Sequence, residues 1–198
     1  MDIFTSQPFL GGAAVALGLF GYFFYVRGIL QGKVKPHTFT WFVWGLLTTI
    51  AFFAQIAAGG GAGAWVTGVT ALFSFGFAAV GLGASSRVFI AKSDWIFFTS
   101  TLLTVPIWYF TGNLLWSVII ITIIDLVAFI PTFRKAFFNP ETENGWTYAL
   151  SGLKFVVSLF ALENFTWTTA LYPMSLVIAN LAFVLMLVWR KYSRKVVI

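Results

Sequence analysis

The chain is a succession of apolar segments, each long enough to cross a lipid bilayer, joined by short polar connections. The segments run near residues 8–26, 39–57, 64–84, 94–111, 114–133, 146–162 and 168–189. A helix of about 20 apolar residues spans the hydrocarbon core, where the backbone must satisfy its own hydrogen bonds. With 60% hydrophobic and 9% charged residues, water cannot be the main solvent of this chain. The pattern predicts an all-α integral membrane protein with seven transmembrane helices.

The basic residues predict how these helices are oriented. Eleven of the twelve Lys and Arg residues follow the first, third, fifth or seventh segment, and none lies in connections 59–64, 111–113 and 162–164. Lys and Arg gather in cytoplasmic connections. We therefore expect the N-terminus outside and the C-terminus inside, in the cell (inner) membrane. The net charge of +6 then reflects topology and contact with the lipid bilayer, so no nucleic-acid partner is expected.

A weak internal repeat divides the chain. Residues 22–44 and 130–148 each run from an aromatic helix end through basic residues and a proline-bearing loop to Trp, at an offset of 105 to 107 residues. The expected architecture is 3+1+3, with the first repeat at 1–90, a connector helix at 91–112, and the second repeat with the basic tail at 113–198. Parallel repeats of this kind are related by a pseudo-twofold axis along the membrane normal, with a cleft between them.

The segments 125–143, 32–44 and 172–180 resemble the PQ-loop membrane proteins, the superfamily of the SWEET and SemiSWEET sugar transporters, and more narrowly its small bacterial members. The resemblance implies a carrier that moves a small polar solute, sugar-like or other, by alternating access. Pro131 occupies the position of the loop proline, so the resemblance implies a hinge there. It also implies that Asn180, midway along the third helix of its repeat, hydrogen-bonds substrate. Ser74 is at the corresponding depth in the first repeat.

Two charged residues lie inside predicted spans, where an unpaired charge is costly and usually functional. Asp125 and Lys154 both fall near the midplane by residue count, on consecutive antiparallel helices. They could form an ion pair that offsets the cost of burying either group alone. Such a pair is either structural, or functional through a protonatable Asp125 or as the polar floor of a binding cavity.

Other side chains of the first repeat complete the candidate site. Trp44 offers a stacking platform, and Thr48 and Thr49 offer hydroxyls; the predicted substrate-binding set is Asn180, Ser74, Trp44 and Thr49. The matching positions to Asp125 and Lys154 in the first repeat are Gly18 and Thr49. The spacing from Ala14 to Gly18 also predicts a close helix contact.

The sequence offers little for metal or catalytic chemistry. His37 is the one histidine, and the chain has no cysteine, so no metal site and no cofactor are expected. Because no nucleophile and base are grouped, we do not expect an enzyme. The alternative to a carrier is a non-transporting receptor or binding protein on the same scaffold, and a homo-oligomer is left open.

Overall fold

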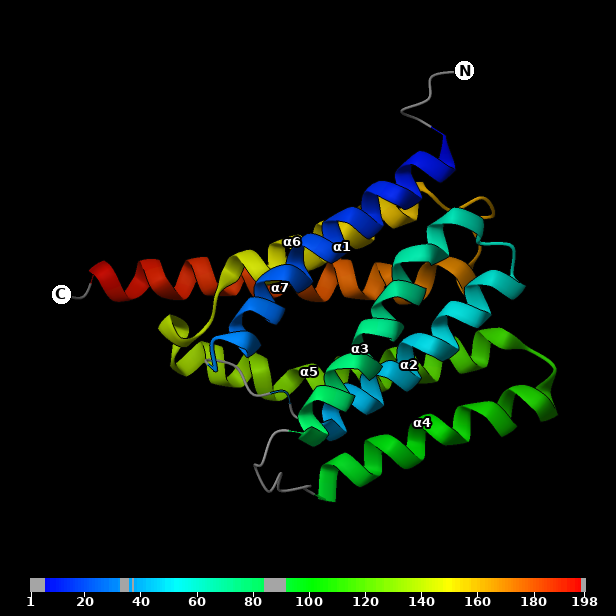
Figure 1. Ribbon diagram of the computed structural model, residues 1–198, viewed down its shortest axis with the longest axis horizontal. Coiled ribbons are helices and arrows are strands. Elements are labelled where there is room, and N and C mark those ends of the chain that lie inside the picture. Colours follow the sequence, from blue (N-terminus) through cyan, green and yellow to red (C-terminus); the bar gives the residue numbers. More distant parts are fainter. Residues whose placement is uncertain (1–5, 33–35, 37, 84–91, 197–198) are drawn as a thin grey trace.

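The computed structural model describes residues 6–32, 36, 38–83 and 92–196, and within these ranges it contains helices and no strand. Figure 1 shows their arrangement. The helices are α1 (Gln7–Leu30), α2 (Thr38–Ala57), η2 (Gly61–Ala64), α3 (Trp65–Gly83), α4 (Lys92–Thr111), α5 (Leu114–Phe138), η3 (Pro140–Thr142), α6 (Gly145–Phe160) and α7 (Trp167–Val196). Each of the seven predicted segments falls on one α-helix.

Five of these helices are long and apolar enough to cross a membrane, by length and composition: Gln7–Leu30, Thr38–Ala57, Gly61–Gly83, Leu114–Phe138 and Trp167–Ser193. The chain is therefore a helical membrane protein. Helix α6 is too short for this criterion, because its 16 residues span only about 24 Å. Helix α4 has 20 residues, but its Ser and Thr residues lower its hydropathy. The count of seven spans stays a prediction.

The polarity of the interior fits this class. Buried side chains include hydroxyls and amides, among them Thr48, Gln55 and Thr67, whereas large apolar side chains such as Phe23 and Ile178 are exposed. A large exposed apolar surface is unfavourable for a monomer in water, but it is favourable in contact with lipid. Several buried hydroxyls bond their own helix, as Thr48 does with the carbonyl of Trp44 at 2.7 Å.

The helices contact one another in a regular pattern. Helix α3 packs against α1 and α2, and α7 packs against α5 and α6. Across the bundle, α1 contacts α6 and α2 contacts α5, while α3 contacts α6 and α2 contacts α7. These contacts form equivalent pairs when α1 is matched with α5, α2 with α6 and α3 with α7. For example, the contact between α1 and α6 then corresponds to the contact between α5 and α2. Helix α4 packs on α5 and α2 and lies along the lower edge of Figure 1.

Small residues bring α1 close to its neighbours. Gly11, Ala14 and Gly18 are its buried residues, which confirms the close contact predicted from the spacing of Ala14 and Gly18. A Cβ atom at Gly11 would lie 2.6 Å from the carbonyl oxygen of Ala62, so only glycine fits there.

One end of the bundle is closed by two connections that hydrogen-bond to each other. We call this the loop junction; it comprises residues 58–64 between α2 and α3 and residues 161–166 between α6 and α7. The amide of Ala62 donates to Oε1 of Glu163 at 3.2 Å, and the amide of Glu163 donates to the carbonyl of Gly60 at 3.3 Å. Asn164 Nδ2 donates to the carbonyl of Ala58 at 3.0 Å. Gly61, with φ of +55°, provides a turn that a side chain would strain.

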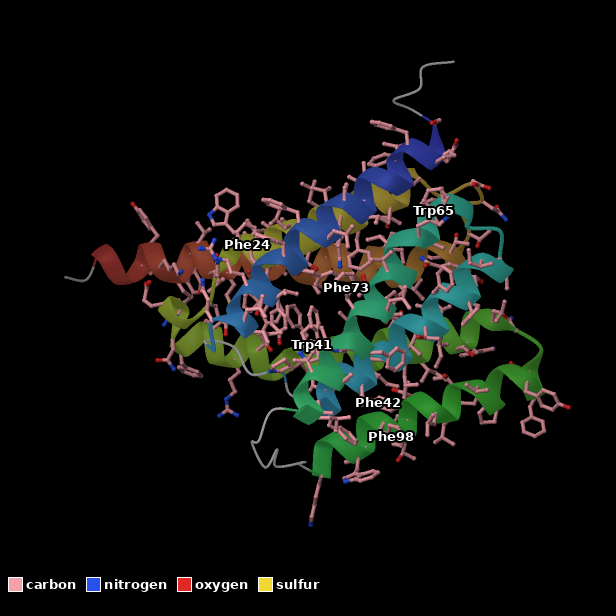
Figure 2. The ribbon with its side chains drawn as sticks, in the orientation of Figure 1. Phe24, Trp41, Phe42, Trp65, Phe73 and Phe98 are labelled. Atoms are coloured by element: carbon pink, nitrogen blue, oxygen red, sulfur yellow. The ribbon has the colours of Figure 1, made fainter. Side chains whose placement is uncertain are left out.

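Aromatic side chains of neighbouring helices pack against one another, as Phe42 of α2 does with Phe98 of α4 (Figure 2). Trp41 contacts Trp44 and Phe77 edge to face, with ring centroids 5.2 and 4.8 Å apart. Its indole Nε1 donates to the Tyr25 hydroxyl at 2.9 Å, which joins α2 to α1.

Candidate functional site

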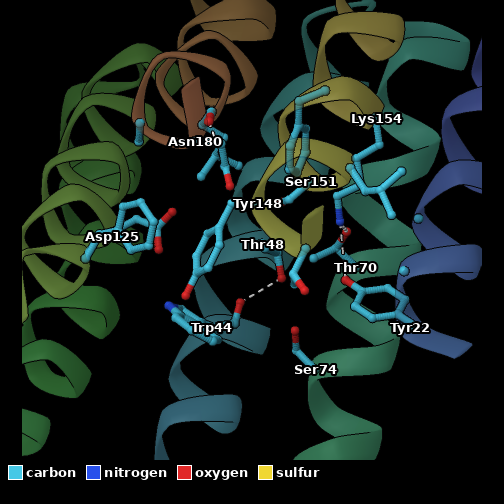
Figure 3. A pocket seen from close by; sticks show the side chains of 18 of the residues that line it. Tyr22, Trp44, Thr48, Thr70, Ser74, Asp125, Tyr148, Ser151, Lys154 and Asn180 are labelled. Carbon is cyan, nitrogen blue, oxygen red and sulfur yellow. Dashed lines mark hydrogen bonds between the residues drawn. The ribbon is translucent and has the colours of Figure 1, made fainter. Parts of the chain in front are cut away.

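A cavity of about 360 Å³ lies among six of the seven α-helices (Figure 3). None of the described side chains of α4 belongs to its lining. The described lining residues are Leu17, Gly18, Gly21, Tyr22 and Tyr25 of α1, Trp41, Trp44 and Thr48 of α2, Thr70 and Ser74 of α3, Asp125, Leu126 and Phe129 of α5, Thr147, Tyr148, Leu150, Ser151, Lys154 and Phe155 of α6, and Tyr172, Leu176, Ala179 and Asn180 of α7. A concave, mainly apolar pocket with a few convergent polar groups is typical of small-molecule sites.

The cavity extends to one end of the bundle and stops short of the other. Trp41 and Thr147 line it from the first turns of α2 and α6. At the opposite end, beyond Thr70 and Tyr172, the loop junction lies between the cavity and solvent. The two ends of the cavity are therefore different.

Seven of the ten described lining residues of α1, α2 and α3 correspond to lining residues of α5, α6 and α7 at nearly constant sequence separation. The separation is 107 residues between α1 and α5 and 106 for the other two pairs of helices. The corresponding positions are Gly18 and Asp125, Tyr22 and Phe129, Trp41 and Thr147, Trp44 and Leu150, Thr48 and Lys154, Thr70 and Leu176, and Ser74 and Asn180. The change by one residue arises because seven residues join α1 to α2 and six join α5 to α6.

This register corrects one assignment made from the sequence. Thr49 was expected opposite Lys154 and in the substrate-binding set, but the described lining includes Thr48 and not Thr49. The Thr49 hydroxyl donates to the carbonyl of Gly45 at 2.6 Å, within its own helix. Successive residues of a helix point about 100° apart, so a shift of one position moves a side chain off the cavity face.

Lys154 is buried, with 6% of its surface exposed. Its ammonium Nζ donates to Oγ1 of Thr70 at 3.1 Å and to the hydroxyl of Tyr22 at 3.4 Å (Figure 3). The same nitrogen lies 5.0 and 4.8 Å from the ring centroids of Tyr22 and Phe155, where the aromatic faces attract a cation. Gly18 leaves room for the lysine, because a Cβ atom there would already contact its Cδ at 3.5 Å.

Asp125 is half-buried on the other side of the cavity in Figure 3. Its Oδ2 accepts a hydrogen bond from the hydroxyl of Tyr172 at 3.4 Å, and Trp44 approaches the same carboxylate. Among the described residues, no salt bridge joins Asp125 to Lys154. The expected ion pair is therefore replaced by two groups that line one cavity with separate, uncharged partners.

Asn180 and Ser74 reach the same cavity, as the repeat predicted. Asn180 is 6% exposed, and its Nδ2 donates to the carbonyl of Leu176 at 2.7 Å. Its amide oxygen has no hydrogen-bond partner among the described residues. Ser74 is 1% exposed, and its hydroxyl likewise lacks a partner in this part of the chain. A buried polar atom without a partner is a candidate for binding a ligand.

Trp44 also lines the cavity. Pro131 falls within the range of α5, but its side chain lies outside the described part of the chain, as does His37. The hinge at Pro131 stays a prediction.

Sequence reasoning missed several aromatic and hydroxyl residues of the lining, including Tyr22, Thr70 and Tyr172. Helical spacing would have found two of them. Thr70 precedes Ser74 by four residues, and Tyr172 precedes Asn180 by eight, so both lie on the helix faces that carry the predicted residues. Tyr22 follows Gly18 by four residues on α1, so the same spacing also places it on the face of Gly18, but a glycine gave no reason to examine that face for polar groups.

The described residues hold no group of three or more His, Asp or Glu side chains that could bind a metal ion. No family model matches the chain, and no match was found among curated proteins or solved structures. The fold and the cavity therefore define the class directly: a helical membrane protein with a central, partly polar cavity.

Proposed function

We propose that this protein is a membrane carrier for a small polar solute, which binds in the central cavity and is moved by alternating access. The proposal includes seven spans, with the N-terminus outside and the C-terminus in the cytoplasm of a cell (inner) membrane. It assigns no catalytic role to the cavity.

The observation that carries the proposal is that three helices from each half of the chain line one cavity and contribute seven pairs of corresponding positions to it. This correspondence supports a 3+1+3 arrangement, because a twofold relation between two units brings equivalent positions to a common axis. The exchange symmetry of the helix contacts supports it independently, and α4 has the place expected of a connector. In carriers built from repeats, the substrate site lies at the interface of the repeats, and one unit rocks against the other.

The cavity reaches one end of the bundle and is closed off from the other by the loop junction. This difference supports one particular state of the transport cycle. With the N-terminus outside, the loop junction lies on the outer face. The end of the cavity that Trp41 and Thr147 line then lies on the side of Arg27 and Arg190. The structure then corresponds to a state that is closed outside and accessible from the cytoplasm. Because the loop junction connects α2 and α3 to α6 and α7, breaking it would separate the outer ends of the two units.

Solute counterflow in liposomes tests this proposal. The purified protein is reconstituted with a panel of small polar solutes, and uptake of each labelled solute is measured against an unlabelled internal pool. We expect uptake that depends on the internal pool and is lost in Ser74→Phe, which fills the cavity, while Gly76→Ala, with open space around its position, retains it. Saturable binding without exchange would favour the receptor alternative. The absence of both binding and exchange would overturn the carrier and the receptor alike.

A further inference from the structure

We infer that the cavity recognises a zwitterionic solute, one molecule that carries an anionic group for Lys154 and a cationic group for Asp125. The inference rests on the proposed function of the cavity as a solute site and names the chemical class of that solute.

The first step concerns Lys154. Its Nζ has three N–H donors, and the described residues supply two acceptors, the hydroxyls of Thr70 and Tyr22. Both are neutral, and no carboxylate in the described part of the chain forms a salt bridge with this ammonium. A buried charge without a counter-charge is costly. An anionic group of a bound solute would supply the counter-charge and use the remaining donor.

The second step concerns Asp125. Its carboxylate accepts from the Tyr172 hydroxyl at 3.4 Å, a long contact. No Lys or Arg side chain of the described chain pairs with it. The neighbouring indole of Trp44 lines the same part of the cavity. The described neighbours of this carboxylate, the Tyr172 hydroxyl and the Trp44 indole, are both neutral. An ammonium group of a bound solute would supply the missing counter-charge.

The third step is the charge balance of the cavity as a whole. Asp125 and Lys154 lie toward opposite sides of the cavity in Figure 3, with Thr48 between them in that view. A solute with one charge would compensate one group and leave the other uncompensated. A neutral polyol would compensate neither. A zwitterion compensates both without bringing net charge into the membrane.

The two halves of the cavity also determine how many solutes bind. The positions that correspond to Asp125 and Lys154 are Gly18 and Thr48, which carry no charge. The cavity therefore contains one anionic and one cationic group in total among its described lining residues. Because the two charged groups differ and both belong to the second half of the chain, the cavity should bind one zwitterion in one orientation, although the two halves correspond in position.

The test uses unbranched amino carboxylates from glycine to 6-aminohexanoate, which place the two charges at increasing separation. For each length, the control solutes are the carboxylate and the amine that lack the second charge, and erythritol represents neutral polyols. Binding to the purified protein is measured by calorimetry. We expect at least one amino carboxylate to bind roughly ten- to a hundredfold more tightly than both of its singly charged controls.

Two variants test which protein group binds which charge of the solute. Lys154→Met should remove the advantage of the amino carboxylate over the amine, and Asp125→Asn should remove its advantage over the carboxylate. Lys154→Arg, which keeps the positive charge, serves as the matched control. If a variant does not fold, the series on the unaltered protein still decides.

The inference is overturned if no amino carboxylate binds better than its controls, or if none of these solutes binds. Exchange of erythritol or a sugar in liposomes without zwitterion binding would overturn the zwitterion and leave the carrier function standing. Loss of exchange for every solute in the panel would instead contradict the carrier function.

Discussion

The ammonium of Lys154 lies 3.1 Å from the hydroxyl of Thr70, in a hydrogen bond that joins α6 to α3. The two residues are 84 positions apart in the chain, and α4 lies between them in the sequence. The contact ties a charged group of the second half to a neutral one of the first half. It also explains why Lys154 and Asp125 need not pair, because the lysine finds oxygen acceptors on the other side of the cavity.

Thermodynamic coupling should follow these contacts. Lys154→Met and Thr70→Val should interact by about 1 kcal/mol in the free energy of unfolding, because either change removes the same charge-assisted hydrogen bond. Lys154→Met and Asp125→Asn should be additive within about 0.5 kcal/mol. Double-mutant cycles by denaturation in detergent measure both. A larger coupling for the second pair would restore the ion pair that the sequence predicted.

Labelling of single cysteines can determine whether α4 and α6 cross the membrane. The chain contains no cysteine, so each variant has one reactive thiol. Asn113→Cys and Phe165→Cys, at exposed positions, should react with a membrane-impermeant maleimide in intact cells. Lys92→Cys and Glu141→Cys, also exposed, should react only after permeabilisation. Asn113 and Lys92 on one face would show that α4 does not cross, and Phe165 and Glu141 on one face would show the same for α6.

Asn180→Ala should weaken binding of a solute that uses the amide by roughly ten- to a hundredfold, since a lost hydrogen bond leaves a polar group of the ligand unpaired. Stability should change little, because the one hydrogen bond of this side chain joins it to its own helix. Ser175→Ala is the matched control: its hydroxyl also bonds its own helix, to the carbonyl of Tyr172 at 2.7 Å, but it is not among the lining residues. Equal affinities in both variants would place the site elsewhere.

Glu163→Ala should loosen the loop junction, because it removes the acceptor of the Ala62 amide. The side chain is exposed, so the effect should be modest, with roughly a two- to fivefold faster labelling of Ser74→Cys from the side of the loop junction. Phe165→Ala, in the same connection and also exposed, should leave the rate unchanged. An unchanged rate in Glu163→Ala would mean that this hydrogen bond does not help to close the cavity at the loop junction.

Gly63→Ala should destabilise the protein by about 1–3 kcal/mol through overpacking. A Cβ atom there would lie 2.8 Å from both the amide of Leu162 and the carbonyl oxygen of Ser158, and neither backbone atom can rotate away. Gly76→Ala, where a Cβ atom would meet nothing within 4 Å, should be neutral or slightly stabilising. Melting temperatures of the two variants in one detergent provide the comparison, and equal values would contradict the close approach.

The positions of the helices could be predicted from the sequence, because they depend on local properties. Apolar length determines where a helix can span lipid, and the polar breaks between the seven segments fall where the α-helices end. The same residue count placed Asp125, Lys154 and Asn180 at similar depth, since rise per residue is constant along a helix. All three line the cavity.

Only the tertiary structure decided which side chains meet across that cavity. Depth does not specify the rotation of a helix about its axis, and one residue of register replaced Thr49 by Thr48. Nor could the partners of Lys154 be derived from its neighbours in sequence, because Tyr22 and Thr70 belong to α1 and α3, which reach it only through the contact between the halves. The loop junction has the same origin, because its closure by Glu163 depends on two connections about 100 residues apart that the fold brings together.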